Sequence, residues 1–160
     1  MTDPGRRLFA AHGFASYRAQ LLERRLAWLL CTAFGDKPAA IPPEDRDQIY
    51  RELSEDTFGK LIGYLKKRLG ADHELIEELK RRLDDRNYLV HRFFWSHAED
   101  IVVKERREFL IGQLDEMAER FRATNQRLTR IYYDWLVAHG IPREALARFL
   151  RENRARVRIT

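Results

Sequence analysis

Cysteine, glycine and proline are scarce in this chain of 160 residues, which contains one Cys, eight Gly and five Pro. With Cys31 as the only cysteine, neither an intrachain disulfide nor a zinc site built from cysteines can form, and a reducing cytoplasmic location is expected. Glycine and proline separate the segments of the chain and do not recur within them, which favours long helices over the frequent turns of a β-protein. The sequence therefore predicts an all-α protein.

Long apolar runs are also missing. No run approaches the roughly 20 residues that a membrane-spanning helix needs, and the first residues, MTDPGRRLF, lack the apolar stretch of a secretory signal. The hydrophobic share of 44% and the charged share of 34% suit a folded, soluble protein of one domain. We therefore expect a single cytoplasmic helical domain over residues 1–160 with no membrane contact. Its core covers about residues 14–140, and a last helix and a basic tail follow at 141–160.

The chain carries 30 Lys and Arg against 25 Asp and Glu, which gives a net charge of +5. This balance permits a polyanionic partner without requiring one. Of the 30 cations, 24 are arginines, whose planar guanidinium fork pairs with phosphate better than an ammonium group does. No glycine-rich phosphate loop or nucleophile elbow is present, and we expect no cofactor.

Apolar residues at helical spacing predict an antiparallel bundle of four to five main helices. We expect Ser54 to cap the third of them and Asp72 to open the fourth, while Gly70 and Gly140 end the third and the fifth. The predicted helices cover about residues 14–34, 44–53, 55–69, 72–101 and 103–139, with a short last helix from Pro142.

One arginine interrupts the pattern of the fourth predicted helix. On a helical wheel Arg86 falls within the apolar stripe that contains Leu83, Val90 and Phe94. An unpaired guanidinium there would be costly to desolvate, so a partner or a ligand must compensate its charge. His97 shares this stripe, and we expect it to be a core histidine with its hydrogen bonds satisfied.

Arg86 also begins a motif. The hexamer RNYLVH separates Arg86 from His91 by four residues and places Asn87 directly after the arginine. It resembles the signature of the HEPN superfamily, R-x4-6-H and often RNxxxH, whose members are helical bundles that frequently act as RNases. The Asn and the place of Arg86 on an apolar stripe distinguish this match from three others with the same Arg–His spacing. Those three are Arg7 with His12, Arg68 with His73, and Arg92 with His97.

The resemblance implies a metal-independent endoribonuclease of the toxin or phage-defence kind. In it, His91 takes a proton from a ribose 2′-hydroxyl, Arg86 stabilises the charge on the attacked phosphate, and Asn87 orients the phosphate or the imidazole. We expect RNA contacts from three further cations and no metal site, since His91 and His97 do not share a helical face. The expected RNA-binding residues are Arg82, Arg92 and Lys104.

Arg86 and His91 lie about 140° apart around a regular helix, so one straight helix does not bring them together. Subunits of the family usually pair so that their motifs meet in a shared cleft, and the resemblance therefore implies a homodimer. An antitoxin or a nucleotidyltransferase is a further expected partner. Candidate interface anchors are Leu21 with Trp28, or Phe93 with Trp95.

Three less specific interpretations stay open at this point. Arg86 can serve a structural ion pair with an acidic residue such as Glu23 or Asp115. The domain can be a HEPN-like module that binds a nucleotide, RNA or a protein without catalysis. Finally, it can be a plain helical interaction protein in which RNYLVH is a coincidence.

Overall fold

The computed structural model describes residues 4–32, 43–69 and 72–144, and these residues form helices and turns without any strand. The all-α prediction is confirmed. Five main helices are joined by one short α-helix and one 3-10 turn, in the order α1 (Pro4–Thr32), α2 (Pro43–Glu55), α3 (Phe58–Leu69), α4 (His73–His91), α5 (Phe93–Ser96), the 3-10 turn Asp100–Val102, and α6 (Lys104–Ala138).

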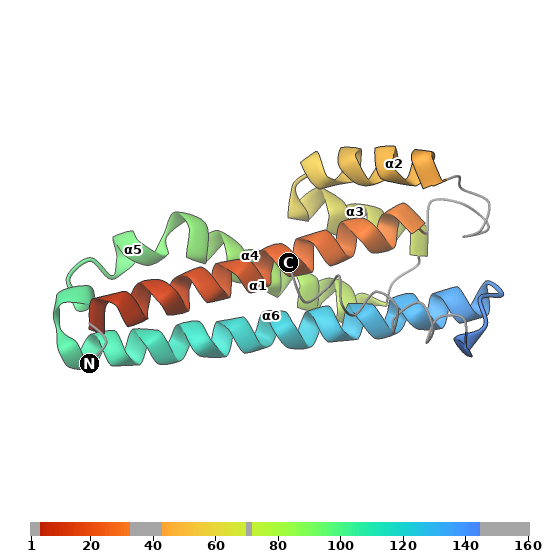
Figure 1. The fold of residues 1–160 in the computed structure, drawn as a ribbon. Coiled ribbons are helices and arrows are strands. Elements are labelled where there is room, and N and C mark those ends of the chain that lie inside the picture. Colours follow the sequence, from red (N-terminus) through yellow and green to blue (C-terminus); the bar gives the residue numbers. More distant parts are fainter. Residues whose placement is uncertain (1–3, 33–42, 70–71, 145–160) are drawn as a thin grey trace.

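The two longest helices, α1 and α6, pack side by side along their length and run in the same direction (Figure 1). Arg7 near the start of α1 pairs with Glu108 near the start of α6 at 2.9 Å. Helix α4 runs in the opposite direction, and α2 and α3 cover the C-terminal end of α1. The N-terminal half of α1 and the end of α4 therefore extend beyond α2 and α3.

The core lies where α1, α3, α4 and α6 meet. Each of these helices turns leucines toward it at helical spacing, as expected for amphipathic helices, and α3, α5 and α6 each add one buried phenylalanine. The fully buried side chains include Leu8, Leu22, Leu26, Leu65, Leu79, Phe93, Leu114 and Phe121. Because Leu8 belongs to this core, the core begins earlier than the predicted residue 14.

Helix α1 begins ten residues before its predicted start at Phe14. Gly13 directly precedes the predicted start, lies exposed inside α1 and has no neighbour within 4 Å of a Cβ position. A solvent-exposed glycine costs a helix only about 1 kcal/mol, and the burial of Leu8 in the preceding turns compensates for this cost. The predicted C-terminal end at Phe34 lies outside the described residues.

The start of α3 also differs from the prediction. Ser54 does not cap this helix: it lies within α2 and donates its hydroxyl hydrogen bond to the Tyr50 carbonyl at 2.6 Å. Thr57 takes the capping position, and its hydroxyl accepts from the Lys60 amide at 3.4 Å. Both residues can cap a helix. Because α2 continues for two residues past its predicted end at residue 53, Ser54 lies inside α2 and Thr57 caps α3. The predicted inward residues Phe58, Leu61, Ile62 and Leu65 are buried, and Gly70 lies outside the described residues.

Asp72 caps α4 as predicted, because its carboxylate accepts from the Leu75 amide at 2.6 Å. The helix ends at His91 and not at Ile101. Tyr88 hydrogen bonds to His97, nine residues later, and in a straight helix two such residues would stand about 13 Å apart along the axis. The bend at Arg92 permits this contact. It also leaves Val90 at 55% and Phe94 at 36% exposure, so the prediction that both face the core is wrong.

Helix α6 agrees with the predicted helix at 103–139. The heptad-like spacing along this segment predicts a seam that faces the bundle; of its residues Leu110, Leu114, Met117, Phe121 and Leu128 are buried, whereas Tyr132 and Trp135 are half-buried. Gly140, with a φ of 90°, follows the helix. Most of the predicted last helix and the basic tail lie outside the described residues. Within the described part, none of the helices has the length and hydropathy to cross a bilayer.

The seam of α6 yields a prediction about stability. Phe121 is completely buried, whereas Phe109 on the same helix is 66% exposed. Replacing Phe121 by alanine is expected to lower the free energy of unfolding by about 3–5 kcal/mol through the cavity it leaves. The matched change Phe109→Ala should stay within about 0.5 kcal/mol of the unsubstituted protein. Urea unfolding followed by circular dichroism measures both values, and equal losses would contradict this description of the core.

Candidate functional site

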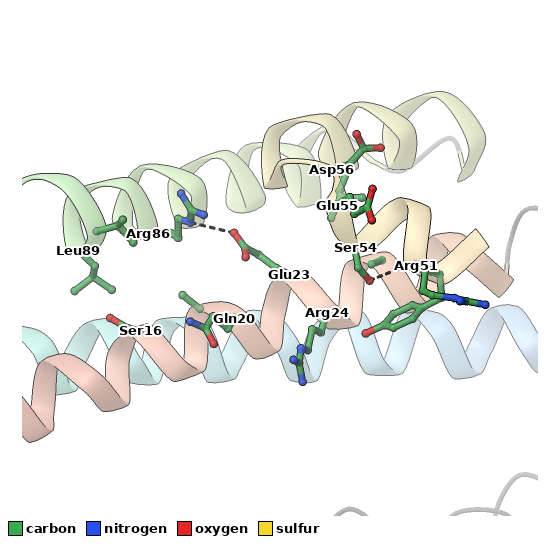
Figure 2. Close-up of a pocket in the computed structure, with 15 residues that line it drawn as sticks. Ser16, Gln20, Glu23, Arg24, Arg51, Ser54, Glu55, Asp56, Arg86 and Leu89 are labelled. Atoms are coloured by element: carbon green, nitrogen blue, oxygen red, sulfur yellow. Dashed lines mark hydrogen bonds and ion pairs between the residues drawn. The ribbon is translucent and has the colours of Figure 1, made fainter. Parts of the chain in front are cut away.

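A groove of about 770 Å³ opens between α1 and the second half of α4, and the end of α2 closes one side of it (Figure 2). Small and polar residues of α1 form its floor, since α1 turns Ser16, Ala19, Gln20 and Glu23 toward it at intervals of three and four residues. The remaining charged lining residues are Arg24, Arg51, Glu55, Asp56 and Arg86.

Arg86 extends from α4 into this groove and forms an ion pair with Glu23 of α1 (Figure 2). The Arg86 Nε and the Glu23 Oε1 atoms are 3.1 Å apart, and the two side chains are 33% and 24% exposed. Arg24 and Arg51 point away from this pair in the same view. The structural ion pair with Glu23 that the sequence left open is therefore present, and it lies in an open groove.

Asn87 supports the same guanidinium. Its side-chain oxygen accepts a hydrogen bond from the Arg86 Nη1 at 3.2 Å. Two of the three guanidinium nitrogens thus have partners, the Nε with Glu23 and the Nη1 with Asn87. The geometry fixes the direction in which Arg86 presents its remaining N–H donors.

The pKa of the Glu23 carboxyl group is shifted by its surroundings in the groove. Burial raises the pKa of Glu23 above its usual value, and the charge of Arg86 opposes this shift only in part. The Oε1 atom is sealed from solvent, and no described residue offers it a well-aligned hydrogen bond. The carboxylate is therefore held in its charged form at an energetic cost.

His91 is the last residue of α4 and lies exposed outside the groove. It makes no hydrogen bond, ion pair or ring contact with any residue that the structure describes. Three other histidines use their ring nitrogens within the fold. These contacts join His12 to the Leu89 carbonyl at 3.0 Å, His97 to Tyr88 and Asp100, and His139 to the Trp135 carbonyl at 2.8 Å.

The structure therefore does not bring Arg86 and His91 together within one chain. Arg86 faces α1 and the groove, whereas His91 lies on a different side of α4, as the angle of about 140° between the two positions requires. Val90, between them, lines the groove and is exposed. A shared site for the two groups needs a second copy of the chain.

The three expected RNA-binding cations lie in different surroundings. Arg92 and Lys104 are exposed, at the end of α4 and at the start of α6. Arg82 is buried and pairs with Asp85, with 3.2 Å between its Nε and the Oδ2, and burial lowers the pKa of its guanidinium. Arg82 thus pairs within α4, and its side chain, which is 11% exposed, offers little surface to RNA.

The residues expected to anchor a dimer interface differ in their exposure. Trp95 is 88% exposed, whereas Phe93 is buried in the core of the chain and is not available to a partner. Trp28 packs edge-on against Tyr50 of α2, with 5.3 Å between the ring centroids. Trp28, which was expected to anchor a contact between subunits, therefore packs against α2 of its own chain.

His97 belongs to a network at the bend after α4. Its two ring nitrogens face the Tyr88 hydroxyl and, at 3.0 Å, the Asp100 carboxylate, which also accepts from Arg106 at 2.8 Å. The hydrogen bonds from His97 and Arg106 lower the pKa of Asp100. His97 is a satisfied histidine as expected, although it is half-buried beside the bend and not in the core.

Sequence reasoning missed most of the groove. Gln20 lies on α1, whereas Ser54 and Asp56 lie at the end of α2 and directly after it, so no spacing within one helix links the two segments. The one sequence feature that indicated the groove was Arg86, the arginine on the apolar stripe of α4. No set of three or more His, Cys, Asp or Glu side chains among the described residues is arranged to hold a metal ion.

Comparison of the chain with protein-family models, with curated proteins and with solved structures found no match. The resemblance to the HEPN superfamily therefore depends on the RNYLVH hexamer and the helical sequence pattern alone.

Proposed function

We propose that the protein is a metal-independent endoribonuclease of the HEPN type that acts as a homodimer, of the toxin or phage-defence kind. Three observations support this function. The chain is an all-α bundle, the Arg86 guanidinium lies in an open groove, and the His91 imidazole lies on the same helix with its ring nitrogens unoccupied in the described chain. RNA is the substrate class that a general base and a phosphate-binding arginine serve together.

The observation that carries the proposal is the state of His91. His97 uses both ring nitrogens in contacts within the fold, and His12 and His139 each use one to contact a backbone carbonyl. The exposed imidazole of His91 has no such contact and is open to exchange a proton with a substrate, as a general base or acid must be. His91 meets this requirement five residues after an arginine that borders a groove.

The proposed reaction is a transesterification. His91 accepts the proton of a ribose 2′-hydroxyl, the 2′-oxygen bonds to the neighbouring phosphorus, and the bond from phosphorus to the 5′-oxygen breaks. A second, protonated His91 from the other subunit gives its proton to the leaving 5′-oxygen. Arg86 stabilises the negative charge on the phosphorane oxygens. The products are a 2′,3′-cyclic phosphate and a free 5′-hydroxyl.

A second subunit is needed because the two groups lie on different sides of α4. The exposed apolar side chains next to His91, Val90, Phe94 and Trp95, suit a contact between copies. Pairing there would place the His91 of one copy beside the groove of the other. The homodimer is therefore part of the proposed function.

The experiment is an incubation of the purified protein with single-stranded RNA in EDTA. We expect cleavage products that end in a 2′,3′-cyclic phosphate, identified by mass spectrometry, because the reaction uses the 2′-hydroxyl and no metal. DNA of the same sequence, which lacks that hydroxyl, should stay intact. Cleavage only after addition of a divalent cation, or equal cleavage of the DNA, would refute the proposed reaction.

A second candidate function is binding without catalysis. It is favoured by one observation: Arg86 lines the groove within a single chain, whereas His91 does not. A module of this kind would hold a nucleotide, RNA or a partner protein through Arg86. Saturable RNA binding that depends on Arg86, together with no detectable products in the incubation above, would identify this function.

A further inference from the structure

The Glu23 carboxylate occupies the position that a phosphate oxygen would take against Arg86. Its Oε1 atom lies 3.1 Å from the Arg86 Nε, inside the groove where the guanidinium is exposed to a ligand (Figure 2). Carboxylate and phosphate oxygens use the same N–H donors of an arginine. Glu23 holds the Nε donor and Asn87 holds one Nη1 donor, so a phosphate that binds Arg86 through its Nε must displace Glu23.

We propose that Glu23 competes with the RNA phosphate for Arg86, so that the ionisation of Glu23 regulates RNA binding in the groove. This inference rests on the proposed function, in which Arg86 contacts a phosphate. Glu23 is then a positioning residue. It keeps the Arg86 guanidinium directed into the groove in the free protein, and the ion pair breaks when the phosphate binds.

The Glu23 contact is suited to being broken. The pair is partly exposed to solvent, and such ion pairs contribute little to stability. The Oε1 atom has no aligned hydrogen bond among the described residues, so its burial is poorly compensated. Exchange of this carboxylate for a phosphodiester, which brings its own charge, therefore costs less than opening a fully satisfied pair.

The direction of the pH effect follows from burial. Because burial raises the pKa of Glu23, this group takes up a proton at a higher pH than an ordinary glutamate does. The neutral acid no longer competes for Arg86, and RNA binding becomes tighter as the pH falls through the pKa of Glu23. At higher pH the ionised carboxylate opposes binding.

Other charged groups of the groove do not hold Arg86 in this way. Helix α3 contributes only Leu61 to the lining, and α6 contributes no lining residue. Asp56 pairs with Lys60 at 3.0 Å. The other charged lining groups are Arg24 on α1 and Arg51 and Glu55 on α2.

Glu55 offers a matched control. It lies in the same groove and carries the same charge as Glu23, but it forms no ion pair with Arg86. Glu55→Gln changes the net charge by the same amount as Glu23→Gln. A general effect of charge on RNA binding would appear in both variants, whereas release of Arg86 would appear in Glu23→Gln alone.

The test measures binding of a fluorescent 2′-O-methyl RNA oligonucleotide, which cannot be cleaved and whose phosphodiester charge is constant between about pH 5 and about pH 8. All proteins also carry His91→Gln, which removes the imidazole of the proposed catalytic base from the comparison. At about pH 8 Glu23→Gln should bind about three- to tenfold more tightly than its parent, and Glu55→Gln should gain less. As the pH is lowered, the affinities of the parent and Glu23→Gln should converge.

Equal affinities of Glu23→Gln and Glu55→Gln at about pH 8 would overturn the competition. Arg86→Ala separates this failure from that of the proposed function. If Arg86→Ala loses binding while Glu23→Gln gains none, only the competition fails; if Arg86→Ala binds as its parent does, the phosphate contact fails and the competition with it.

A second measurement does not depend on the folding of Glu23→Gln. Calorimetry of the His91→Gln protein in buffers of different ionisation enthalpy gives the protons taken up on RNA binding. Loss of Arg86 to the phosphate raises the pKa of Glu23 further, so proton uptake is expected just above its pKa in the free protein. No uptake, or release of protons, would overturn the inference.

Discussion

Replacing His91 by alanine is expected to lower the rate of RNA cleavage by about 100- to 10,000-fold, the contribution of a positioned general base or acid. The free energy of unfolding should change little, because His91 is exposed and has no partner among the described residues. Rates from labelled RNA in EDTA, together with urea unfolding of both proteins, measure the two quantities.

His73 provides the control for this substitution. It is also an exposed histidine of α4, and Arg68 precedes it at the same spacing as Arg86 precedes His91. Its position at the start of the helix, about three and a half turns from Arg86, separates it from the groove. His73→Ala should therefore cleave RNA at the unsubstituted rate, and an equal loss in both variants would contradict a special role of His91.

Arg86→Lys is expected to lower the cleavage rate by about 100- to 1,000-fold, the usual cost of removing one preorganised donor to the developing charge. Lysine keeps the positive charge but lacks the planar fork that binds two phosphate oxygens at once. Because the ion pair with Glu23 is partly exposed, stability should change by no more than about 1 kcal/mol. The same cleavage and unfolding measurements apply.

Arg120→Lys is the matched control, since Arg120 also forms a partly exposed ion pair, with Asp85 at 3.3 Å, but lies on α6 outside the groove. This change should leave cleavage unaltered. If Arg86→Lys retains the full rate, charge alone suffices at that position, and bidentate contact with the phosphate is not part of the reaction.

The helices could be predicted from local signals, and the errors occur where tertiary contacts decide. The seam from Leu110 to Leu128 predicted α6 because each of its turns buries a side chain against the bundle. The early start of α1 was missed because the burial of Leu8 is a tertiary contact, which the local sequence does not reveal. The bend after His91 contains neither Gly nor Pro, and the hydrogen bond between Tyr88 and His97 favours it only once the chain has turned.

The candidate site could be predicted in part. The position of Arg86 on an apolar stripe required a partner, and Glu23 was one of two carboxylates considered; the structure selects Glu23 over Asp115. The groove itself could not be predicted, because residues of α1, α2 and α4 form it together and only packing places them side by side. A helical wheel likewise could not predict that Val90 is exposed and that Arg82 is buried.

The central claim is that Arg86 and His91 act on one phosphodiester although they lie on different sides of α4. The most direct measurement is the structure of the protein in complex with a 2′-O-methyl RNA. We predict two copies of the chain around one strand, with an Arg86 guanidinium about 3 Å from a phosphate and a second copy's His91 within hydrogen-bond reach of the neighbouring 2′-oxygen. RNA bound elsewhere, or at Arg86 with every His91 facing solvent, would contradict the claim.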